Sequence, residues 1–297
     1  MSQRLRGITS MLLSVGFFAG MDALLKLMAQ YYPPLEVSAL RGAASLPFVL
    51  GVTWARGRLR DLKPVRWSLH LVRGVLAIIM LTSFVYALRL LPMADAYALF
   101  LAAPLIVTAL SMPLLRERVD WRRWVAVAVG LCGTLALLRP SAASLATVGA
   151  LAAVASAACY ALSAITIRVL TRTDTTASMV FWFMSMLTVF AGLLAVPNWV
   201  PLRNEHWSLL VGIGVLGALG QHFVTEAFRH APAATIAPFE YTALLWAVAI
   251  DWIFWAHAPS THMLAGAAII IASGIYLIHR ERREHRAAIT AECNVPP

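Results

Sequence analysis

The sequence predicts an all-α membrane protein, with ten transmembrane helices arranged as two inverted five-helix repeats and both termini in the cytoplasm. Three observations support this prediction: a very apolar composition, ten apolar runs of membrane-spanning length, and a match between the two halves of the chain. Of the 297 residues, 60% are hydrophobic and 13% are charged, and the mean hydropathy is +0.75. Soluble domains are about one quarter charged. This composition therefore excludes a disordered chain, a disulfide scaffold and an ordinary soluble enzyme.

The ten apolar runs are each expected to form a helix. A bilayer core about 30 Å thick takes roughly 20 apolar residues of helix, and an isolated strand would leave its backbone groups unsatisfied in lipid. Short connections, many of them marked by proline, separate the runs. The runs cover residues 8–30, 36–55, 69–90, 93–115, 122–139, 145–169, 176–197, 207–229, 232–255 and 261–279.

The basic residues predict the orientation. If the N-terminus lies inside, eighteen of the 24 Lys and Arg residues fall in inside segments and three in outside segments. Cytoplasmic loops collect Lys and Arg, so both termini are expected in the cytoplasm, with a basic tail over 280–297 that meets membrane lipid headgroups. The net charge of +10 is spread over short clusters, and no nucleic-acid partner is expected.

The two halves of the chain resemble each other. The stretch at 86–110 aligns without a gap with the stretch at 226–250, 140 residues later, with identities that include Arg89/Arg229 and Pro92/Pro232. The alternative is that apolar helices look alike by composition. A repeat of five spans is odd in number, so the second half must enter the membrane from the other side. We therefore expect inverted repeats over 7–139 and 147–279, an arrangement typical of secondary transporters.

Several stretches resemble the drug/metabolite transporter superfamily in its EamA branch, and the resemblance covers nearly the whole chain. They are "LRGAASLPF" with Arg41, "RGVLAIIMLTSFVYALRLLPMADAYAL", "LLRERVDWRRWVAVAVGLCGTLALLRP", "APFEYTALLWAV" and "LAGAAIIIASGIYLI". The resemblance implies a ten-helix bundle around a central cavity. It also implies that a small organic metabolite (amino acid, nucleoside-like or vitamin-like) crosses the bacterial inner membrane by alternating access, without ATP.

The chain departs from that family in one turn. Many relatives carry Leu-Gly-Glu after the fourth span, whereas this chain has Leu115, Arg116 and Glu117. The departure puts the local turn in doubt.

Ionisable residues inside the first four runs are candidate site residues, because a charge at mid-bilayer is costly unless it meets a partner or a cavity. Asp22 and Lys26 lie four residues apart and are a candidate structural pair. Arg41 is expected to face the cavity, where it could bind an anionic group, with pairing to Asp22 or Glu36 as the alternative. Asp95 is a binding candidate or a helix cap. For Arg73, snorkelling to lipid headgroups explains its position as well as a function does.

The eighth run carries a polar stripe. Gln221, His222, Thr225, Glu226 and Arg229 share one helix face, and Tyr86 is the repeat partner of Glu226. Such a stripe favours water or a polar ligand, and an interhelical hydrogen-bond seam is the alternative. His222, Glu226 and Tyr86 are therefore candidates for substrate binding or coupling.

The ninth run holds the strongest cavity candidate, Glu240, about nine residues into the span. Tyr241 and Trp246 are neighbouring aromatic candidates, and Asp251 lies on almost the same face. A carboxylate buried without a cation can take up a proton, so Glu226 or Glu240 is a candidate for proton coupling. Within the runs, five acidic residues against three basic ones favour a zwitterionic or cationic substrate.

Other function classes find less support. The chain has no GxSG, no HExxH and no clustered histidines, so an intramembrane enzyme, a metal site and a cofactor are not expected. No nucleotide-binding motif is present. A channel or a lipid scramblase-like permease remains the alternative to a secondary transporter.

Overall fold

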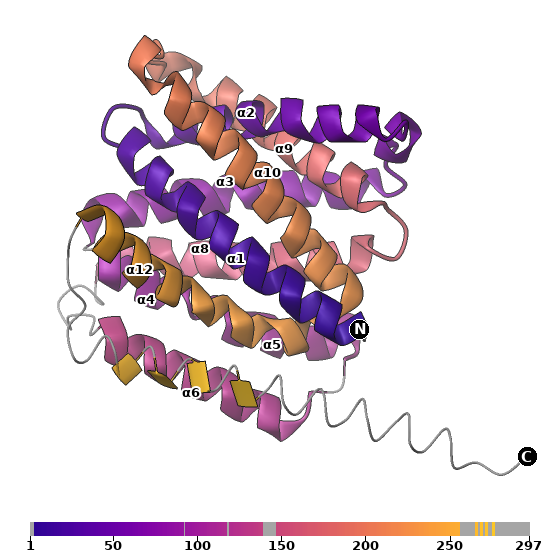
Figure 1. The fold of residues 1–297 in the computed structure, drawn as a ribbon, viewed down its shortest axis with the longest axis vertical. Coiled ribbons are helices and arrows are strands. Elements are labelled where there is room, and N and C mark those ends of the chain that lie inside the picture. Colours follow the sequence, from indigo (N-terminus) through magenta and orange to yellow (C-terminus); the bar gives the residue numbers. More distant parts are fainter. Residues whose placement is uncertain are drawn as a thin grey trace, which may run out of the picture.

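The computed structural model describes residues 3–91, 93–117, 119–138 and 147–255, together with 265–266, 268–269, 271–272 and 275–276. Within these residues the regular structure is entirely helical (Figure 1). The first part of the chain forms α1 (Gln3–Met28), α2 (Pro34–Ala55), η1 (Leu59–Leu62), α3 (Trp67–Leu90), α4 (Met93–Phe100), α5 (Ala103–Leu115) and α6 (Trp121–Leu138). The second part forms α8 (Val148–Leu170), α9 (Thr176–Ala195), η2 (Val196–Asn198), η3 (Asn204–His206), α10 (Trp207–His230), α11 (Ala233–Ile236), η4 (Ala237–Thr242) and α12 (Ala243–Trp255).

The predicted all-α class is confirmed, and the number of spans is only partly supported. Seven helical segments of the described chain are long and apolar enough to cross a membrane. The tenth predicted run, 261–279, lies almost wholly outside the described residues. The seven segments are Gln3–Met28, Pro34–Ala55, Trp67–Phe84, Val148–Leu170, Thr176–Asn198, Asn204–His230 and Ala233–Ile250.

The fourth and ninth runs are not the continuous helices that the sequence predicted. The fourth run divides into α4 and α5, and the ninth divides into α11, η4 and α12. Pro104 sits in the first turn of α5 and Pro238 in the first turn of η4, where the missing amide hydrogen and the fixed φ favour a new helical start over continuation. The helices after the two breaks begin at Ala103 and Ala243, which are 140 residues apart. The repeat seen in the sequence therefore recurs as a break at matching positions.

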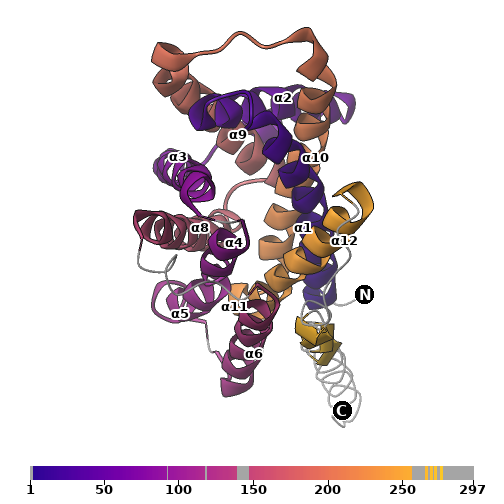
Figure 2. The ribbon, with the colours of Figure 1, turned by 90° about the vertical axis from the view of Figure 1, so that its left-hand side faces the viewer.

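The helices of the two halves pack on each other in a reciprocal order. The most extensive contacts join α1 to α10, α2 to α9 and α3 to α8, so the first helix of each half meets the third helix of the other. Figures 1 and 2 show these pairs side by side. The broken helices follow the same rule, since α4 and α5 lie on α8 while η4 and α12 lie on α1.

Glycine permits close approach of α2 to two of its neighbours, α10 and α9. A Cβ added at Gly214 of α10 would collide with the carbonyl oxygen of Ala44 in α2. One added at Gly42 of α2 would collide with the Thr188 hydroxyl in α9. Small residues of this kind let helix backbones meet where lipid provides no hydrophobic drive for association.

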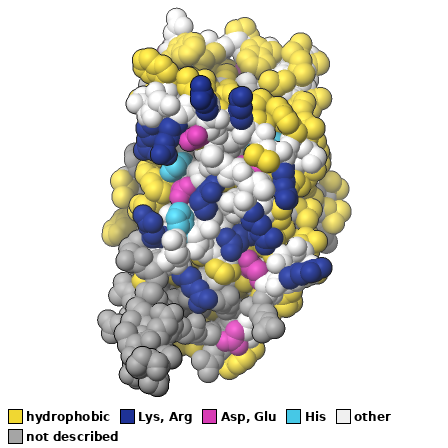
Figure 3. Space-filling model, turned by 90° about the vertical axis from the view of Figure 1, so that its right-hand side faces the viewer, with side chains coloured by type: hydrophobic (Ala, Val, Ile, Leu, Met, Phe, Trp, Pro, Cys, Tyr) yellow, Lys and Arg dark blue, Asp and Glu magenta, His cyan; other side chains and the backbone are white. Residues whose placement is uncertain are grey.

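The two ends of the bundle differ in charge. We call the N-terminal end the one where α1 and α3 begin and α2, α8 and α10 end, and the opposite end the one where α1 ends and α10 begins. Figure 3 faces the N-terminal end and shows Lys and Arg side chains spread across it. The segments that meet there carry Arg4, Arg6, Arg56, Arg58, Arg60, Lys63, Arg66, Arg168, Arg172 and Arg229.

The turn that departs from the family pattern carries backbone strain. Arg116, the C-cap of α5, has φ = 56° and lies in the left-handed region, with its amide donating to the carbonyl of Ser111. Glycine adopts this conformation without cost, whereas a side chain costs roughly 1 kcal/mol. The turn therefore has an arginine at a position whose backbone conformation glycine would adopt more readily.

Candidate functional site

A cavity of about 380 Å³ lies inside the bundle. Its wall is built from α1, α2, α3 and α4 of the first half and from α8, α9, α10, η4 and α12 of the second. It reaches from Ile167 and Phe228, near the N-terminal end, to Lys26, near the opposite end. Most of the wall is apolar or aromatic, which suits the body of a small organic ligand. Its ionisable and other polar side chains are Asp22, Lys26, Arg41, Arg73, Tyr97, Ser156, Tyr160, Ser163, Gln221 and Glu240.

One group of polar side chains joins α1, α2 and α4 in this wall. Arg41 is 6% exposed, and it interacts electrostatically with Asp22. The hydroxyl of Tyr97 donates to Asp22 at 3.4 Å, and the Arg41 guanidinium lies 5.6 Å from the centre of the Phe18 ring. Arg41 and Asp22 thus both line the cavity and influence each other electrostatically, but no ion pair joins the two described side chains. Lys26, the other member of the expected pair, also lines the cavity.

A second polar group lies at the break in the ninth run. Glu240 is 6% exposed and belongs to η4, the short 3-10 segment between α11 and α12. Tyr160 of α8 lies near its carboxylate in the cavity wall, and among the described residues the carboxylate oxygen Oε1 has no hydrogen-bond partner. An unmatched buried acceptor costs free energy unless a ligand or a proton satisfies it. Glu240 is therefore placed to meet a bound molecule.

Arg73 of α3 lines the same cavity and is 1% exposed. The interpretation that it snorkels to lipid headgroups is wrong, because the side chain points into the bundle, where its guanidinium lies 4.7 Å from the centre of the Phe183 ring of α9. The position of Arg73 along the third run did not predict that its side chain points inward, because the sequence does not say which face of this helix meets α9. Tyr97, Tyr160, Ser156 and Ser163 were missed for the same reason.

Other predicted residues lie away from the cavity. Tyr86 and Trp246 are each 47% exposed, and His222 is exposed as well. Tyr241 is 1% exposed, and its ring packs closely against Gly130 of α6. Asp95 belongs to α4, but its side chain is outside the described part of the structure.

The polar stripe of the eighth run divides between two places. Gln221 lines the cavity, and the hydroxyl of Thr225 donates to the carbonyl of Gln221 within the helix. Glu226 instead accepts a short hydrogen bond from Thr176 and lies 3.7 Å from Arg229 Nε. Gln221 thus belongs to the cavity wall, whereas Glu226 and Arg229 belong to a seam between helices.

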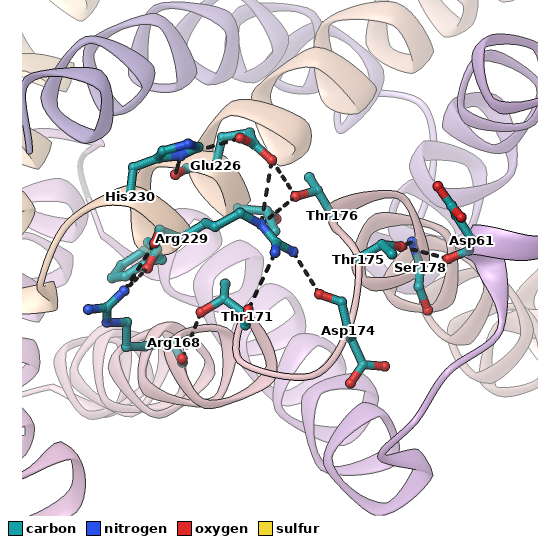
Figure 4. A network of polar contacts seen from close by, with 12 residues as sticks. Asp61, Arg168, Thr171, Asp174, Thr175, Thr176, Ser178, Glu226, Arg229 and His230 are labelled. Carbon is teal, nitrogen blue, oxygen red and sulfur yellow. Dashed lines mark hydrogen bonds and ion pairs between the residues drawn. The ribbon is translucent and has the colours of Figure 1, made fainter. Parts of the chain in front are cut away.

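Two arginines form that seam, one at the end of α8 and one at the end of α10, and each reaches across to the end of the other helix (Figure 4). Arg229 of α10 donates to the carbonyls of Asp174 at 2.7 Å and Thr171 at 3.3 Å, just after α8. Arg168 of α8 donates to the carbonyls of Phe228 at 2.8 Å and Arg229 at 3.2 Å, at the end of α10. Each arginine thus caps the other helix, where free carbonyls and the helix dipole favour a cation. We call these contacts the arginine exchange.

Glu117, the last residue of the departing turn, extends the seam to the ninth run. Its carboxylate lies 3.4 Å from Arg168 Nε. It also accepts hydrogen bonds from the amides of Ala233 at 3.3 Å and Ala234 at 3.4 Å, at the start of α11. The seam therefore connects α5, α8, α10 and α11 at the N-terminal end.

A buried histidine and aspartate complete the closure of this end. The Nε2 atom of His70 in α3 lies 3.0 Å from Asp174 Oδ1, which also accepts from the Val65 amide at 2.9 Å. Burial opposes ionisation of Asp174, but these bonds and one from the Thr173 hydroxyl outweigh it, so the pKa of the carboxyl is held below its usual value. The turn between α8 and α9 is consequently tied to α3 as well as to α10.

The charges around the cavity differ from the balance inferred from whole runs. Three basic residues, Lys26, Arg41 and Arg73, line it with two acidic ones, Asp22 and Glu240. Glu226 belongs to the N-terminal seam, and the side chains of Asp95 and Asp251 are not described. The expectation of a cationic substrate therefore has no support from the cavity wall. Among the described residues, no group of three or more His, Cys, Asp and Glu side chains is placed to hold a metal ion.

Comparisons with known proteins agree with this architecture. The chain is 29% identical to a riboflavin transporter of Vibrio cholerae, over 89% of this chain and 91% of that one. It is 30% identical to a pseudopaline exporter of Pseudomonas aeruginosa, over 91% and 95%. It is 27% identical to an S-adenosylmethionine uptake transporter of Rickettsia conorii, over 94% of each chain. A crystal structure with 21% identity shares the fold, with a TM-score of 0.78 over 95% of this chain and 98% of the other.

The model of the EamA-like transporter family matches residues 5–139 and again residues 147–280. Together these stretches span almost the whole chain. The protein is therefore a member of the EamA-like transporter family, a multi-pass membrane transporter and not an enzyme.

Proposed function

We propose that this protein is a secondary transporter that carries a small organic metabolite across the bacterial inner membrane by alternating access. The observation that supports this most directly is the cavity of about 380 Å³, whose wall joins both halves of the bundle and contains buried charges of both signs. A site at the interface of two related halves is what rocking of one half against the other requires. Relatives named for riboflavin, pseudopaline and S-adenosylmethionine support a metabolite of this size class.

The proposed architecture is two inverted five-helix repeats, over 7–139 and 147–279, with both termini in the cytoplasm. The reciprocal pairing of α1 with α10 and α3 with α8, and the matching helix breaks at Ala103 and Ala243, support two related halves. The concentration of basic residues at the N-terminal end supports a cytoplasmic location for that end. The basic tail over 280–297 would then face the cytoplasm and the lipid headgroups.

Within this mechanism, Glu240 is the proposed coupling residue. It lines the cavity beside Tyr160, it keeps one carboxylate oxygen without a partner, and no cation forms an ion pair with it among the described residues. A carboxylate so placed can exchange a proton with a ligand or with water that enters when one end opens. Glu226 is the weaker candidate, because Arg229 and His230 hold it in the seam.

Solute counterflow in proteoliposomes tests the proposal. The liposomes hold a pooled panel of amino acids, nucleosides, riboflavin, S-adenosylmethionine and polyamines, and mass spectrometry reads the exchange of isotope-labelled forms. We expect saturable exchange of one compound or a small group, stimulated by the same compound on the far side, and loss of pH-gradient-driven uptake in Glu240→Gln.

Two results would contradict the proposal. Flux that does not saturate and is not stimulated from the far side would indicate a channel, and movement of lipid alone would indicate a scramblase. Unchanged pH-gradient-driven uptake in Glu240→Gln would remove the coupling role of that residue and leave the carrier function standing. Glu205→Gln, a change at an exposed carboxylate of the opposite end, is the matched control.

A further inference from the structure

Arg73 is a cavity residue whose buried charge has no counter-ion among the described side chains. It lines the cavity and is 1% exposed, yet among the described residues its only hydrogen bond runs from Nη1 to the main-chain oxygen of Met179, at 3.3 Å. The Nε and Nη2 atoms have no acceptor, and no carboxylate of the described residues forms an ion pair with the side chain. A buried charge without a counter-ion is strongly unfavourable in a protein interior.

The two unmatched atoms lie along one edge of the guanidinium group. That edge presents two parallel N–H donors, which fit the two oxygens of a carboxylate or the oxygens of a phosphate. The centre of the Phe183 ring lies 4.7 Å from the guanidinium carbon, and the ring covers one face of the group. The Nη1 donor, on the other side of the group from this edge, donates to the main-chain oxygen of Met179. Both contacts come from α9, so they hold the guanidinium in place and leave the Nε–Nη2 edge for another partner.

The remaining cavity charges do not neutralise this arginine. Asp22 lies beside Arg41 and accepts from Tyr97. Glu240 keeps its Oε1 atom without a partner, but it forms no ion pair with Arg73. Among the described residues, neither acidic side chain of the wall pairs with Arg73, so its Nε–Nη2 edge is left for an oxyanion that enters the cavity.

We propose that Arg73 binds an acidic group of the transported molecule, edge-on through Nε and Nη2, and that the substrate is therefore a metabolite bearing a carboxylate or a phosphate. This inference rests on the proposed carrier function and specifies its substrate class. The edge is shielded from solvent in this conformation, so the substrate engages it when the neighbouring wall side chains move apart. Because Met179 and Phe183 belong to α9, an anion at this edge binds an arginine that α9 holds in place.

The test uses pairs of compounds that differ by one acidic group. They are tryptophan with tryptamine, S-adenosylmethionine with its decarboxylated form, and riboflavin 5′-phosphate with riboflavin. Counterflow in proteoliposomes and thermal unfolding of the purified full-length protein are measured with each compound. The variants are Arg73→Gln, Arg73→Lys and, as the control, Arg203→Gln, which removes an arginine that lies over the ring of Tyr31 away from the cavity.

We expect the wild-type protein to exchange the acidic member of at least one pair and to be stabilised by it. Arg73→Gln should lower that exchange about tenfold or more and abolish the stabilisation, with little change for the member that lacks the acidic group. Arg73→Lys keeps the charge without the two-donor edge and should fall between the two, whereas Arg203→Gln should match the wild type. The carboxylate pairs and the phosphate pair distinguish the two kinds of acidic group.

Three results would overturn the inference, and they separate it from the carrier function. If the wild type exchanges only compounds without an acidic group, or if Arg73→Gln exchanges the acidic compounds as well as the wild type does, the carrier function stands and the role of Arg73 is wrong. If no compound is exchanged and no acidic compound stabilises the wild type in preference to Arg73→Gln, both are wrong. Stabilisation by an acid that depends on Arg73, without exchange, would support the binding role and contradict the carrier.

Discussion

The two ends of the bundle are closed by different chemistry. At the N-terminal end, Arg168 and Arg229 cap each other's helices, and Asp174 is held by His70 and the backbone. At the opposite end, the Tyr32 hydroxyl lies 2.8 Å from His206 Nδ1 and accepts from the Arg203 amide at 3.0 Å, and Glu36 accepts from the Val200 amide at 2.9 Å.

The difference lies in the use of charge. The N-terminal contacts join cationic side chains to helix C-termini and a buried histidine to a carboxylate, and charge-assisted bonds of this kind are roughly twice as strong as neutral ones. At the opposite end, the described contacts are tilted and edge-on aromatic contacts and hydrogen bonds from main-chain amides, one of them to the Glu36 carboxylate. The N-terminal end thus has more charge-assisted contacts, and under the proposed carrier function these are the contacts that would break for the cavity to open there.

The largest effect is expected from Asp174→Ala. The change leaves His70, which is 1% exposed, and the Val65 amide without their partner. An unmatched buried group such as His70 costs about 1–3 kcal/mol, and Val65 is 66% exposed, so its amide adds little. The free energy of unfolding should therefore fall by about 2–3 kcal/mol. Thermal unfolding of the purified protein in detergent measures it.

The pH dependence provides a check on that variant. Because the pKa of Asp174 is held below its usual value, the stabilisation is complete above that usual value and is lost as the pH falls through the lowered one. The difference in the free energy of unfolding between the wild type and Asp174→Ala should therefore become smaller in strong acid. Equal stability of the two proteins at neutral pH would contradict the account of this end, and Glu205→Ala, at an exposed site of the opposite end, should change stability by less than about 0.5 kcal/mol.

A second, smaller effect is expected from Arg229→Gln. The change removes the hydrogen bonds to the carbonyls of Asp174 and Thr171, on a side chain that is 29% exposed. We expect a loss of about 1–2 kcal/mol in the free energy of unfolding, together with faster labelling, from the N-terminal side, of a cysteine introduced at the cavity residue Ser163. Arg203→Gln, the matched arginine of the opposite end, should leave that labelling rate unchanged. The same rise in both variants would erase the distinction between the two ends.

At the opposite end, Tyr32→Phe should cost about 1 kcal/mol. It removes one hydroxyl that bonds to His206 Nδ1 and to the Arg203 amide, and it keeps the ring contact with His206. Thermal unfolding and labelling from that side are the measurements. A loss as large as that of Asp174→Ala would show that the two ends are closed with equal strength.

The smallest effect, and the only gain, is expected from Arg116→Gly. Glycine relieves the left-handed strain at φ = 56° while keeping Glu117 in place to cap α11 and pair with Arg168. The free energy of unfolding should rise by about 0.5–1 kcal/mol. Arg118→Gly, two residues on, serves as the control, and a loss of stability in Arg116→Gly would mean that the arginine side chain has a role of its own.

The sequence predicted the helices well because membrane-spanning length and apolar composition are local properties. It did not predict the breaks at Ala103 and Ala243, since proline is compatible with both a kinked helix and a new helical start. Glu240 was chosen by its depth in its run, which is also a local property, and Arg41 by its match to the arginine of the resembled family; both line the cavity.

The direction in which a side chain points around its helix was harder to predict than its position along the membrane-spanning run. Tyr86, His222 and Trp246 had suitable chemistry and depth, but their side chains face away from the cavity. Arg73 lies near the end of its run and still faces inward, because α9 packs on that side of α3. Only the pairing of helices from the two halves decides such cases, and that pairing is not encoded in either helix alone.

The most direct test of the central claim, a cavity that opens to one side at a time, is the sidedness of labelling at Ser163→Cys. Ser163 lines the cavity and is 6% exposed, and the natural cysteines 132, 159 and 293 are replaced by alanine. A membrane-impermeant thiol reagent is added to one side or the other of oriented vesicles. We predict faster labelling from the opposite side in the resting protein and a shift towards the N-terminal side in Arg229→Gln. Equally fast labelling from both sides of the resting protein would indicate an open pore and contradict the account.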